Sequence, residues 1–377
     1  MPRPEPAADA WIAASLERWF GSNARALPWR VPWAGGMRRD PWASLVSEVM
    51  AQQTQIARAA EKFIVFIERY PTPTALADAA DTPGGEDQVR ALWQGLGYYR
   101  RARLLIEASR AIRDRHAGVT PTDAALLRAL PGVGAYTAGA VASIAADLPE
   151  ALVDGNVGRV LLRVLAPDGV PHQPANGATQ RWLWARARSI AEHASSPGDA
   201  NEGLMELGAT VCTPRNARCL HCPLSDRCKA LATGRVGSIP EPKPRAPKRD
   251  LHATAVIVRD DRGRVLIERR PRAGLWAELW QAPTDEGAAE IEPGDVLERL
   301  GFRRERAAAE LGAFEFQTTH RRVRFRVFGV RTPVRDADAR KLAGGGRRWV
   351  EPGDLDGIIA GRAQRLVLEL AGVMGVT

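Results

Sequence analysis

LPGVGAYTAGAVASIAADLPEALVDGNVGRV, residues 130–160, is the stretch that decides how the first part of this chain folds. Its first turn, 131–134, presents backbone N–H groups at the start of a predicted helix over 135–146, and both features favour a bound phosphate. A carboxylate, Asp154, follows in a second turn bounded by glycine. An ordinary helix-turn-helix corner explains the first turn equally well, because short motifs often match by chance.

The same glycines imitate a dinucleotide-binding fingerprint, since Gly132 and Gly134 precede the acidic Asp154 at a suitable interval. That fingerprint requires a strand before its first glycine. Here the preceding residues, 122–130, have apolar side chains at helical spacing, and Thr137 stands in place of the third glycine. The sequence therefore argues against a nicotinamide or flavin site.

The chain is long enough for two or three domains, and its charge balance is basic. It has 377 residues, with 53 Lys plus Arg against 44 Asp plus Glu and a formal net charge of +9. A polyanionic partner and mere solubility both explain such a balance, and the clustering of arginines favours the partner. The clustered arginines are Arg100, Arg101, Arg103, Arg110, Arg113 and Arg115, and then Arg321, Arg322, Arg324 and Arg326.

The cysteines and the apolar runs indicate the compartment. All four cysteines fall within residues 212–228, which is not the distribution of a disulfide framework, so we expect a reducing compartment. The N-terminal residues show no signal-peptide core, and no run reaches the length of a membrane span. We expect a soluble cytoplasmic protein.

Helical periodicity runs through roughly the first 230 residues, so we expect an all-helical unit there. Residues 81–87, DTPGGED, are predicted to form a loop. The predicted helices before residue 130 cover 9–21, 41–56, 57–70, a short segment ending near Ala80, 88–96, 101–116 and 122–130.

A linker and a second, α+β domain are predicted beyond the helices. Residues 235–250 hold four prolines and five basic residues, a composition typical of linkers. Beyond them the apolar period changes to two. We expect strands at 252–258 and 264–269 around a turn at 260–263, a strand pair within 313–330, and helices near 294–300 and 355–370.

The cysteine spacing, C-x6-C-x2-C-x5-C, predicts a metal centre. Zinc ribbons usually pair two C-x2-C knuckles at a longer interval, whereas here one knuckle is flanked by single cysteines on short loops. This spacing suits a compact iron–sulfur cluster, with zinc as the alternative. The predicted ligands are Cys212, Cys219, Cys222 and Cys228.

Five motifs in order resemble the endonuclease III superfamily of helix-hairpin-helix DNA glycosylases, and within it the adenine DNA glycosylases of MutY type. They are SEVMAQQT at 47–54, GLGYYRRAR at 95–103, LPGVGAYTAGA at 130–140, VDGNVGRV at 153–160 and the four-cysteine loop. The resemblance covers residues 19–231 continuously and the second domain more weakly. It implies a helical glycosylase domain at 1–234 with one [4Fe–4S] cluster, a linker at 235–250 and a Nudix-like lesion-recognition domain at 251–377.

Glu48 and Asp154 match the catalytic positions of that family. Adenine leaves readily only as a neutral species, so a general acid must protonate the base, and burial beside apolar side chains would keep Glu48 protonated. Asp154 would stabilise the developing oxocarbenium charge on the sugar, or bond to it transiently. The alternatives are a helix-face salt bridge for Glu48 and a helix N-cap for Asp154.

Tyr136 separates two enzyme types within the superfamily. Bifunctional members have a lysine here that attacks the sugar as a Schiff-base nucleophile. Tyrosine forms no imine, so the resemblance implies a monofunctional enzyme in which Tyr136 and Asn156 position groups around the two carboxyls. The nearest lysine in the sequence, Lys62, belongs to no recognised motif.

Other positions match parts of the family that bind DNA. A target base must be flipped out of the duplex, and a side chain must fill the gap. Gly132 and Gly134 would grip the DNA strand. Gln53 and Tyr98 match the intercalating positions and Trp29 and Arg30 the adenine pocket, while Ala51 replaces a leucine of many members.

The second domain resembles the Nudix-like module with which this family reads 8-oxoguanine. GLWAELWQAP at 274–283 fits it, but EGAAEIEPGDVLERL at 286–300 lacks the arginine and clustered glutamates of a working pyrophosphohydrolase. We therefore expect binding without hydrolysis. The family reads the lesion with Phe-Ser-His, which corresponds here to Thr318, Thr319 and His320.

The resemblance implies a monofunctional glycosylase that removes adenine opposite 8-oxoguanine, and also opposite guanine, from double-stranded DNA. We expect a monomer, associated with the nucleoid and not with a membrane. The rival interpretations are a pyrimidine-directed glycosylase with lyase activity and a non-catalytic protein that binds damaged DNA.

Overall fold

A computed structural model of the chain describes residues 5–33, 36–241, 247–332, 342–343, 346–359 and 361–375. The chain forms two compact units, and neither is a single run of sequence. The first unit comprises Met1–Ala79 and Leu104–Pro244, and the second comprises Ala80–Arg103 and Arg245–Thr377. The second unit thus contains a helical segment from the middle of the predicted all-helical part.

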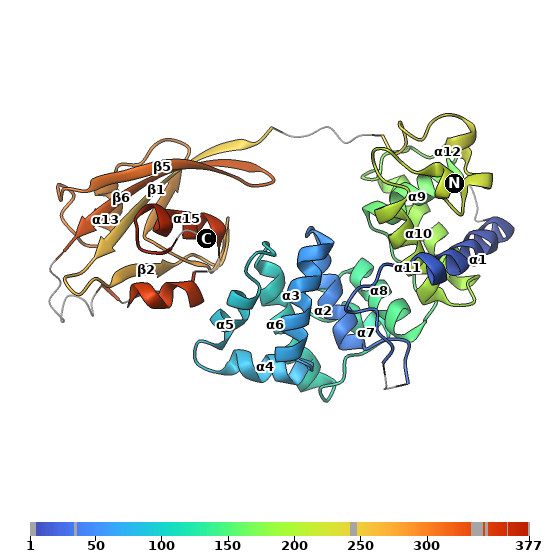
Figure 1. Cartoon of the computed structure of the whole chain (residues 1–377), viewed down its shortest axis with the longest axis horizontal. Coiled ribbons are helices and arrows are strands. Elements are labelled where there is room, and N and C mark those ends of the chain that lie inside the picture. Colours follow the sequence, from blue (N-terminus) through green and yellow to red (C-terminus); the bar gives the residue numbers. More distant parts are fainter. Residues whose placement is uncertain are drawn as a thin grey trace. The chain divides into compact units, whose positions relative to one another are not determined.

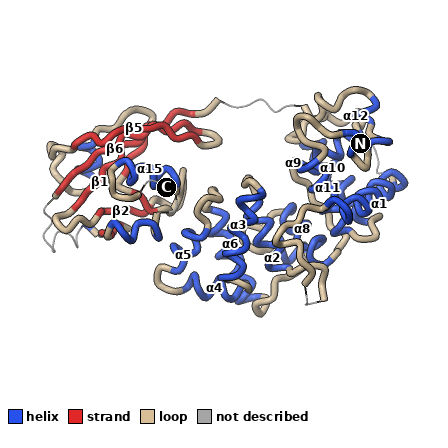
Figure 2. Tube along the Cα trace, viewed as in Figure 1, coloured by secondary structure: helices blue, strands red, loops and turns tan. Residues whose placement is uncertain are grey.

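The described residues up to Glu241 are built from helices and loops, which confirms the predicted all-helical part (Figures 1 and 2). Their buried apolar side chains include a core that packs α1, α8, α9, α10 and α11 together. The helices are α1 (Pro6–Asn23), α2 (Pro41–Ala51), α3 (Ile56–Arg69), α4 (Pro73–Asp81), α5 (Gly85–Leu92), α6 (Arg100–Arg115), α7 (Ala124–Arg128), α8 (Ala135–Ala146), α9 (Gly155–Leu165), α10 (Gly177–Glu192), α11 (Pro197–Thr210), η1 (Cys219–His221), η2 (Ser225–Arg227) and α12 (Lys229–Ala232).

The turn between α7 and α8 is a close-packed hairpin. Gly132 has a φ of +76°, and a Cβ at this position would lie 2.6 Å from Cβ of Leu104. A larger residue would therefore meet both backbone strain and a clash. Gly134 is the N-cap of α8, whose bounds agree with the sequence prediction. The hairpin predicted from 130–146 is confirmed.

Several predicted boundaries in the helical part are wrong. The helix from Pro41 was predicted to continue to Ile56, but α2 ends at Ala51, because Gln53 adopts the left-handed φ of 54° and Ile56 begins α3. Residues 85–87 were predicted to lie in a loop but form the first turn of α5, which follows the left-handed Gly84.

The rest of the second unit is α+β, as predicted. Its sheet has the order β3-β2-β1-β6-β5, with β4 pairing to β1 and β7 to β2; β1 and β6 run parallel, while the other pairs are antiparallel. α13 packs over one apolar cluster of the sheet and α15 over another. The elements are β1 (Arg249–Arg259), β2 (Val265–Arg269), β3 (Trp280–Gln281), β4 (Thr284–Gly287), α13 (Pro293–Arg299), β5 (Ala309–Gln317), β6 (Arg321–Arg331), β7 (Arg347–Val350), η3 (Pro352–Gly357) and α15 (Arg362–Leu370).

Two further expectations need adjustment. The helix predicted at 355–370 is two elements, η3 and α15. In the predicted linker, Ile239 is buried in the core of the first unit, and Arg249 already belongs to β1. Residues 242–246 of that linker lie outside the described residues. The three domain limits stay predictions.

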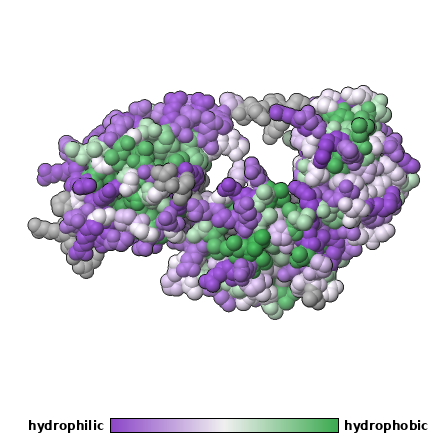
Figure 3. All heavy atoms as spheres, viewed as in Figure 1, coloured by the Kyte–Doolittle hydropathy of each residue, from purple (hydrophilic) through white to green (hydrophobic). Residues whose placement is uncertain are grey.

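The face of the molecule drawn in Figure 3 carries both hydrophilic and hydrophobic side chains. Within the described ranges, the helices are too short or too polar to cross a membrane.

Gly139 gives a test of the packing of α8. A Cβ on Gly139 would lie 1.9 Å from the carbonyl oxygen of Ala151. Since backbone must move to relieve this clash, we expect Gly139→Ala to lower the free energy of unfolding by about 2–3 kcal/mol in urea titrations. The control is Gly21→Ala in α1, where the added methyl meets no atom within 4 Å. An unchanged stability for Gly139→Ala would contradict the described packing.

Candidate active site

Glu48 is a buried carboxylic acid in α2, with 8% of the residue exposed. Burial raises the pKa of its carboxyl from the ordinary 4.5 to about 7, although a hydrogen bond with Tyr136 lowers it. The negative charges of Asp154 and Glu202 raise this pKa further, and Arg30 lowers it. Glu48 therefore keeps its proton in a large share of the molecules near pH 7.

Tyr136 stands in the first turn of α8, directly after the hairpin turn. Burial, together with the charges of Glu48 and Asp154, raises the pKa of its phenol well above the ordinary 10.0. The hydroxyl group therefore stays protonated over the physiological range and can donate a hydrogen bond to a carboxylate. The structure thus brings three of the predicted residues into electrostatic contact.

Asp154 is the N-cap of α9. Its Oδ1 accepts a hydrogen bond from the backbone N–H of Val157 at 2.7 Å, and its Oδ2 accepts one from Nδ2 of Asn156 at 3.2 Å. Burial raises the pKa of Asp154, and these hydrogen bonds oppose that rise. The alternative role of Asp154 as a helix N-cap is therefore confirmed, and this cap fixes the carboxylate at the N-terminus of α9.

An arginine behind Asn156 connects this carboxylate to the cysteine loop. Arg159 donates from Nη2 to Oδ1 of Asn156 at 2.8 Å and from Nε to the carbonyl oxygen of Cys212 at 2.7 Å. Its Nη2 also lies 2.7 Å from the carbonyl oxygen of Gly208, on α11. Arg159 belongs to the VDGNVGRV motif, but sequence reasoning gave it no role. Its partners Cys212 and Gly208 are distant in sequence, so the motif does not reveal these contacts.

Arg30 is held in place by two buried carboxylates of α11. Its Nε lies 2.8 Å from Oε1 of Glu202, and its Nη2 lies 3.0 Å from Oε2 of Glu206. Burial alone would raise the pKa of Glu206, but Arg25 and Arg30 lower it. Glu202 also pairs with Arg39 at 2.9 Å. Sequence reasoning missed both acids, although two carboxylates one turn apart in the apolar NEGLMELGA were an available signal.

The other predicted residues of the first unit lie at or near its surface. Trp29 packs edge-on against Phe63, with 5.3 Å between ring centroids. Gln53 is exposed in the left-handed turn after α2, and Gly132 and Gly134 are exposed in the hairpin turn. These positions are open to a ligand, but their predicted contacts with DNA stay predictions.

Three predicted recognition residues belong to the second unit and are described within it. Thr319 and His320 are exposed in the turn between β5 and β6. Tyr98, from the helical segment of this unit, is also exposed, and its hydroxyl lies 2.8 Å from Oγ1 of Thr319. The structure therefore brings the predicted wedge and the predicted lesion reader together.

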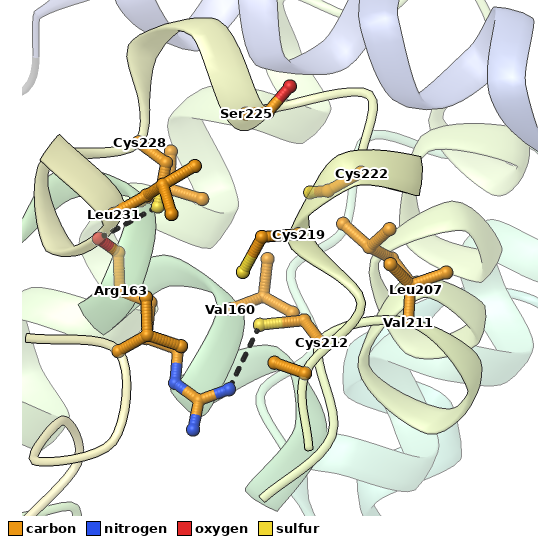
Figure 4. A pocket seen from close by; sticks show the side chains of 13 residues that line it. Val160, Arg163, Leu207, Val211, Cys212, Cys219, Cys222, Ser225, Cys228 and Leu231 are labelled. Carbon is orange, nitrogen blue, oxygen red and sulfur yellow. Dashed lines mark hydrogen bonds between the residues drawn. The ribbon is translucent and has the colours of Figure 1, made fainter. Parts of the chain in front are cut away.

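The four cysteines line one small cavity (Figure 4). Within the described ranges, no three His, Cys, Asp or Glu side chains are placed to hold a metal ion. The four cysteines of the predicted metal centre therefore share one cavity.

Arg163 borders this cavity and is itself buried. Its Nη1 lies 3.4 Å from Sγ of Cys212 (Figure 4). The same Nη1 donates to the carbonyl oxygen of Thr213 at 2.8 Å, and Nε donates to that of Ile239 at 2.7 Å. One guanidinium group thus joins α9, the cysteine loop and the beginning of the predicted linker.

This geometry combines a protonated acid with a second carboxyl group in a buried setting. The environments differ: burial is the largest influence on the pKa of Glu48 and favours its neutral form, whereas Asp154 accepts hydrogen bonds from Val157 and Asn156 that favour its charged form. Such a pair supports acid catalysis at one atom and charge stabilisation at another.

Comparison with known proteins gives matches for both parts of the chain. Residues 46–186 match the HhH-GPD superfamily of base excision DNA repair proteins, and residues 253–370 match the NUDIX domain. The solved structure of a thermostable thymine-DNA glycosylase has a TM-score of 0.51 at 24% identity and covers 61% of this chain and 100% of that one. This likeness concerns the fold.

Several similar proteins carry the name adenine DNA glycosylase. The rat protein is 35% identical over 72% of this chain and 59% of its own length. Those of Schizosaccharomyces pombe and Mycobacterium tuberculosis H37Rv are 32% and 39% identical, over 75% and 59% of this chain and 71% and 69% of their own lengths. The chain spans about three fifths of the length of its mammalian relatives.

The raised pKa of Glu48 predicts a pH-dependent stability. Its carboxyl binds a proton more tightly in the folded chain than in the unfolded chain, so the free energy of unfolding falls as pH rises from about 4.5 through about 7. We expect Glu48→Gln to remove about 1–3 kcal/mol of this fall between pH 5 and pH 8, measured by urea titration. Glu61→Gln, on the exposed side of α3, should keep the profile of the unaltered protein.

Proposed function

Since this chain belongs to the adenine DNA glycosylase family, we propose that it hydrolyses the N-glycosidic bond of adenine in double-stranded DNA as a step of base excision repair. The observation that carries this proposal is the pair of carboxyl groups, Glu48 and Asp154, in one buried setting with Glu48 protonated near pH 7.

Glu48 is the general acid in this proposal. Its proton passes to a ring nitrogen of adenine as the bond to the sugar breaks, so the base leaves as a neutral species. Trp29 and Arg30, which match the family's adenine pocket, bind the base, and Arg30 lies within electrostatic reach of Glu48. Trp29, beside Arg30, supplies the apolar wall.

Asp154 stabilises the positive charge that develops on the sugar, or forms a bond to it that water then breaks. Its helix cap and Asn156 hold the carboxylate in position. Tyr136 shares a hydrogen bond with Glu48 and interacts electrostatically with both acids, so it orders the pair. Because Tyr136 replaces the lysine of lyases, the reaction ends with base release and leaves the strand uncut.

Recognition of the DNA uses several of the predicted residues. The hairpin glycines Gly132 and Gly134 bind a phosphate, and Gln53 and Tyr98 fill the gap that the flipped adenine leaves. Thr319 and His320 read 8-oxoguanine opposite the adenine, and a guanine there is accepted as well. The enzyme acts as a monomer in the nucleoid.

The cofactor is one [4Fe–4S] cluster held by Cys212, Cys219, Cys222 and Cys228. All four cysteines line one cavity, and this shared cavity together with the C-x6-C-x2-C-x5-C spacing supports the assignment. When bound, the cluster cross-links the loop through iron–thiolate bonds. Arg163 donates toward Cys212, and the backbone of the same loop receives Arg159, so the cofactor keeps the support of Asn156 in place.

Release of free adenine from a duplex with one A:8-oxoguanine pair tests the function. We expect release at pH 7 that declines as pH rises past about 7, because Glu48 loses its proton. Glu48→Gln should lower the single-turnover rate by at least about 10²-fold, and Asp154→Asn by about 10²–10³-fold. Glu61→Gln is the control, since it removes an exposed carboxylate.

Three results would contradict the proposal. Full activity of Glu48→Gln or Asp154→Asn would remove the assigned roles. Trapping of a covalent protein–DNA adduct by borohydride would favour a pyrimidine-directed glycosylase with lyase activity. A protein that binds mismatched DNA but releases no base would be a damage-binding protein.

Visible absorption and metal analysis test the cofactor. We expect a brown protein with about four iron atoms per chain. Cys219→Ser should lose colour and iron, whereas Ser225→Ala, which alters another residue of the same cavity, should retain both. A colourless protein that contains zinc would overturn the assignment.

A further inference from the structure

Asp87, in the first turn of α5, is the meeting point of several groups of the second unit. Its Oδ2 accepts a hydrogen bond from Nε1 of Trp280 at 3.0 Å, and its Oδ1 accepts one from Nη1 of Arg90 at 2.9 Å. Arg269 and Arg348 lie 3.8 and 3.9 Å from its carboxylate oxygens. Its side chain is 18% exposed, so these contacts are shielded from water to a large degree.

Apart from Arg90, the partners of Asp87 come from three adjacent strands. β2 pairs with β3, placing Arg269 opposite Trp280, and β2 also pairs with β7, placing Ile267 opposite Arg348. The guanidinium carbon of Arg348 lies 4.2 Å from the centre of a Trp280 ring. One carboxylate therefore compensates two arginines and an indole N–H that the sheet presents together.

The segment 80–103 makes two more polar contacts with the sheet domain. Tyr98 bonds with Thr319 at 2.8 Å, and Nε of Arg103 lies 3.3 Å from Oε2 of Glu278. Tyr98 has the left-handed φ of 47°, a backbone conformation that an L-residue adopts at a cost unless neighbouring contacts hold it. The position of Tyr98 depends on how firmly its segment is held.

We propose that Asp87 is a positioning residue for lesion recognition. It fastens the segment that carries Tyr98 to the sheet that carries Thr319 and His320, so that wedge and reader meet the DNA in one fixed arrangement. This inference rests on the proposed function, because it assigns Asp87 to the discrimination between 8-oxoguanine and guanine opposite adenine. Asp87 itself touches neither base.

Loss of Asp87 should affect the two substrates unequally. Asp87→Ala leaves Arg269 and Arg348 without their shared carboxylate and Trp280 without its acceptor, which loosens the segment. We expect KM for A:8-oxoguanine to rise about 5–10-fold, with a change of less than about twofold in KM for A:G and in both single-turnover rates. Trp280→Phe, which removes the N–H and keeps a ring, should act in the same direction.

The matched control is Asp295→Asn in α13. It also removes one carboxylate charge that pairs with an arginine, Arg304, but it lies on the helix that covers the other apolar cluster of the sheet. We expect its preference for A:8-oxoguanine to equal that of the unaltered protein. A general loss of stability in the second unit would lower the preference in both variants.

Hydrogen exchange supplies a readout that needs no activity. In Asp87→Ala, amides of 95–100 and 318–321 should exchange faster, whereas Asp295→Asn should leave them unchanged. A double-mutant cycle adds a second criterion: combining Asp87→Ala with Thr319→Ala should raise KM for A:8-oxoguanine less than the product of the two single effects, because Asp87 acts through the contact of Tyr98 with Thr319.

The outcomes separate the two hypotheses. An unaltered protein that does not prefer A:8-oxoguanine would overturn the proposed lesion reading, and with it the specificity role of Asp87. A preference that survives Asp87→Ala, an equal rise of KM for both duplexes, or unchanged exchange at 95–100 and 318–321 would overturn the Asp87 role alone.

Discussion

The interaction of the buried Glu48 with two neighbouring carboxyl groups is the constraint on which the first unit depends. Glu48 lies within electrostatic reach of Asp154 and Glu202, and burial opposes its charge. Three negative charges there would be costly, so the unit distributes them by environment. Asp154 receives backbone and amide hydrogen bonds, Glu202 receives arginines, and Glu48 retains a proton.

Both α11 and α9 supply groups that stabilise the charged carboxylates. α11 offers Glu202 and Glu206 to arginines from the loop that also holds Trp29. α9 offers its N-terminus to Asp154 and its Arg159 to Asn156. The two helices approach so closely that a Cβ on Gly208 would lie 2.6 Å from that of Asn156. The position of Asn156, and with it that of the Asp154 carboxylate, therefore depends on the packing of α9 against α11.

Local sequence patterns predicted the features that are determined by residues close together in the chain, such as helix bounds and motif positions. The bounds of α8 follow from its glycine turn and apolar period. The predicted end of α2 was wrong because the left-handed backbone of Gln53 is not determined by the apolar pattern. The positions of Glu48, Asp154 and the cysteines came from motifs. Glu202, Arg159 and the parallel pairing of β1 with β6 depend on distant partners, which periodicity does not reveal.

The membership of segment 80–103 in the second unit has a consequence for how the chain is made. Asp87 and Trp280 are 193 residues apart in sequence. At ribosomal speeds, about 10–40 s separate the synthesis of the two. During that interval α5 has emerged while β2, β3 and β7 have not, so this contact belongs to a late stage of folding with a high closure entropy. A ribosome-bound chain therefore passes through a state in which the helices have been synthesised but segment 80–103 cannot yet pack against the sheet.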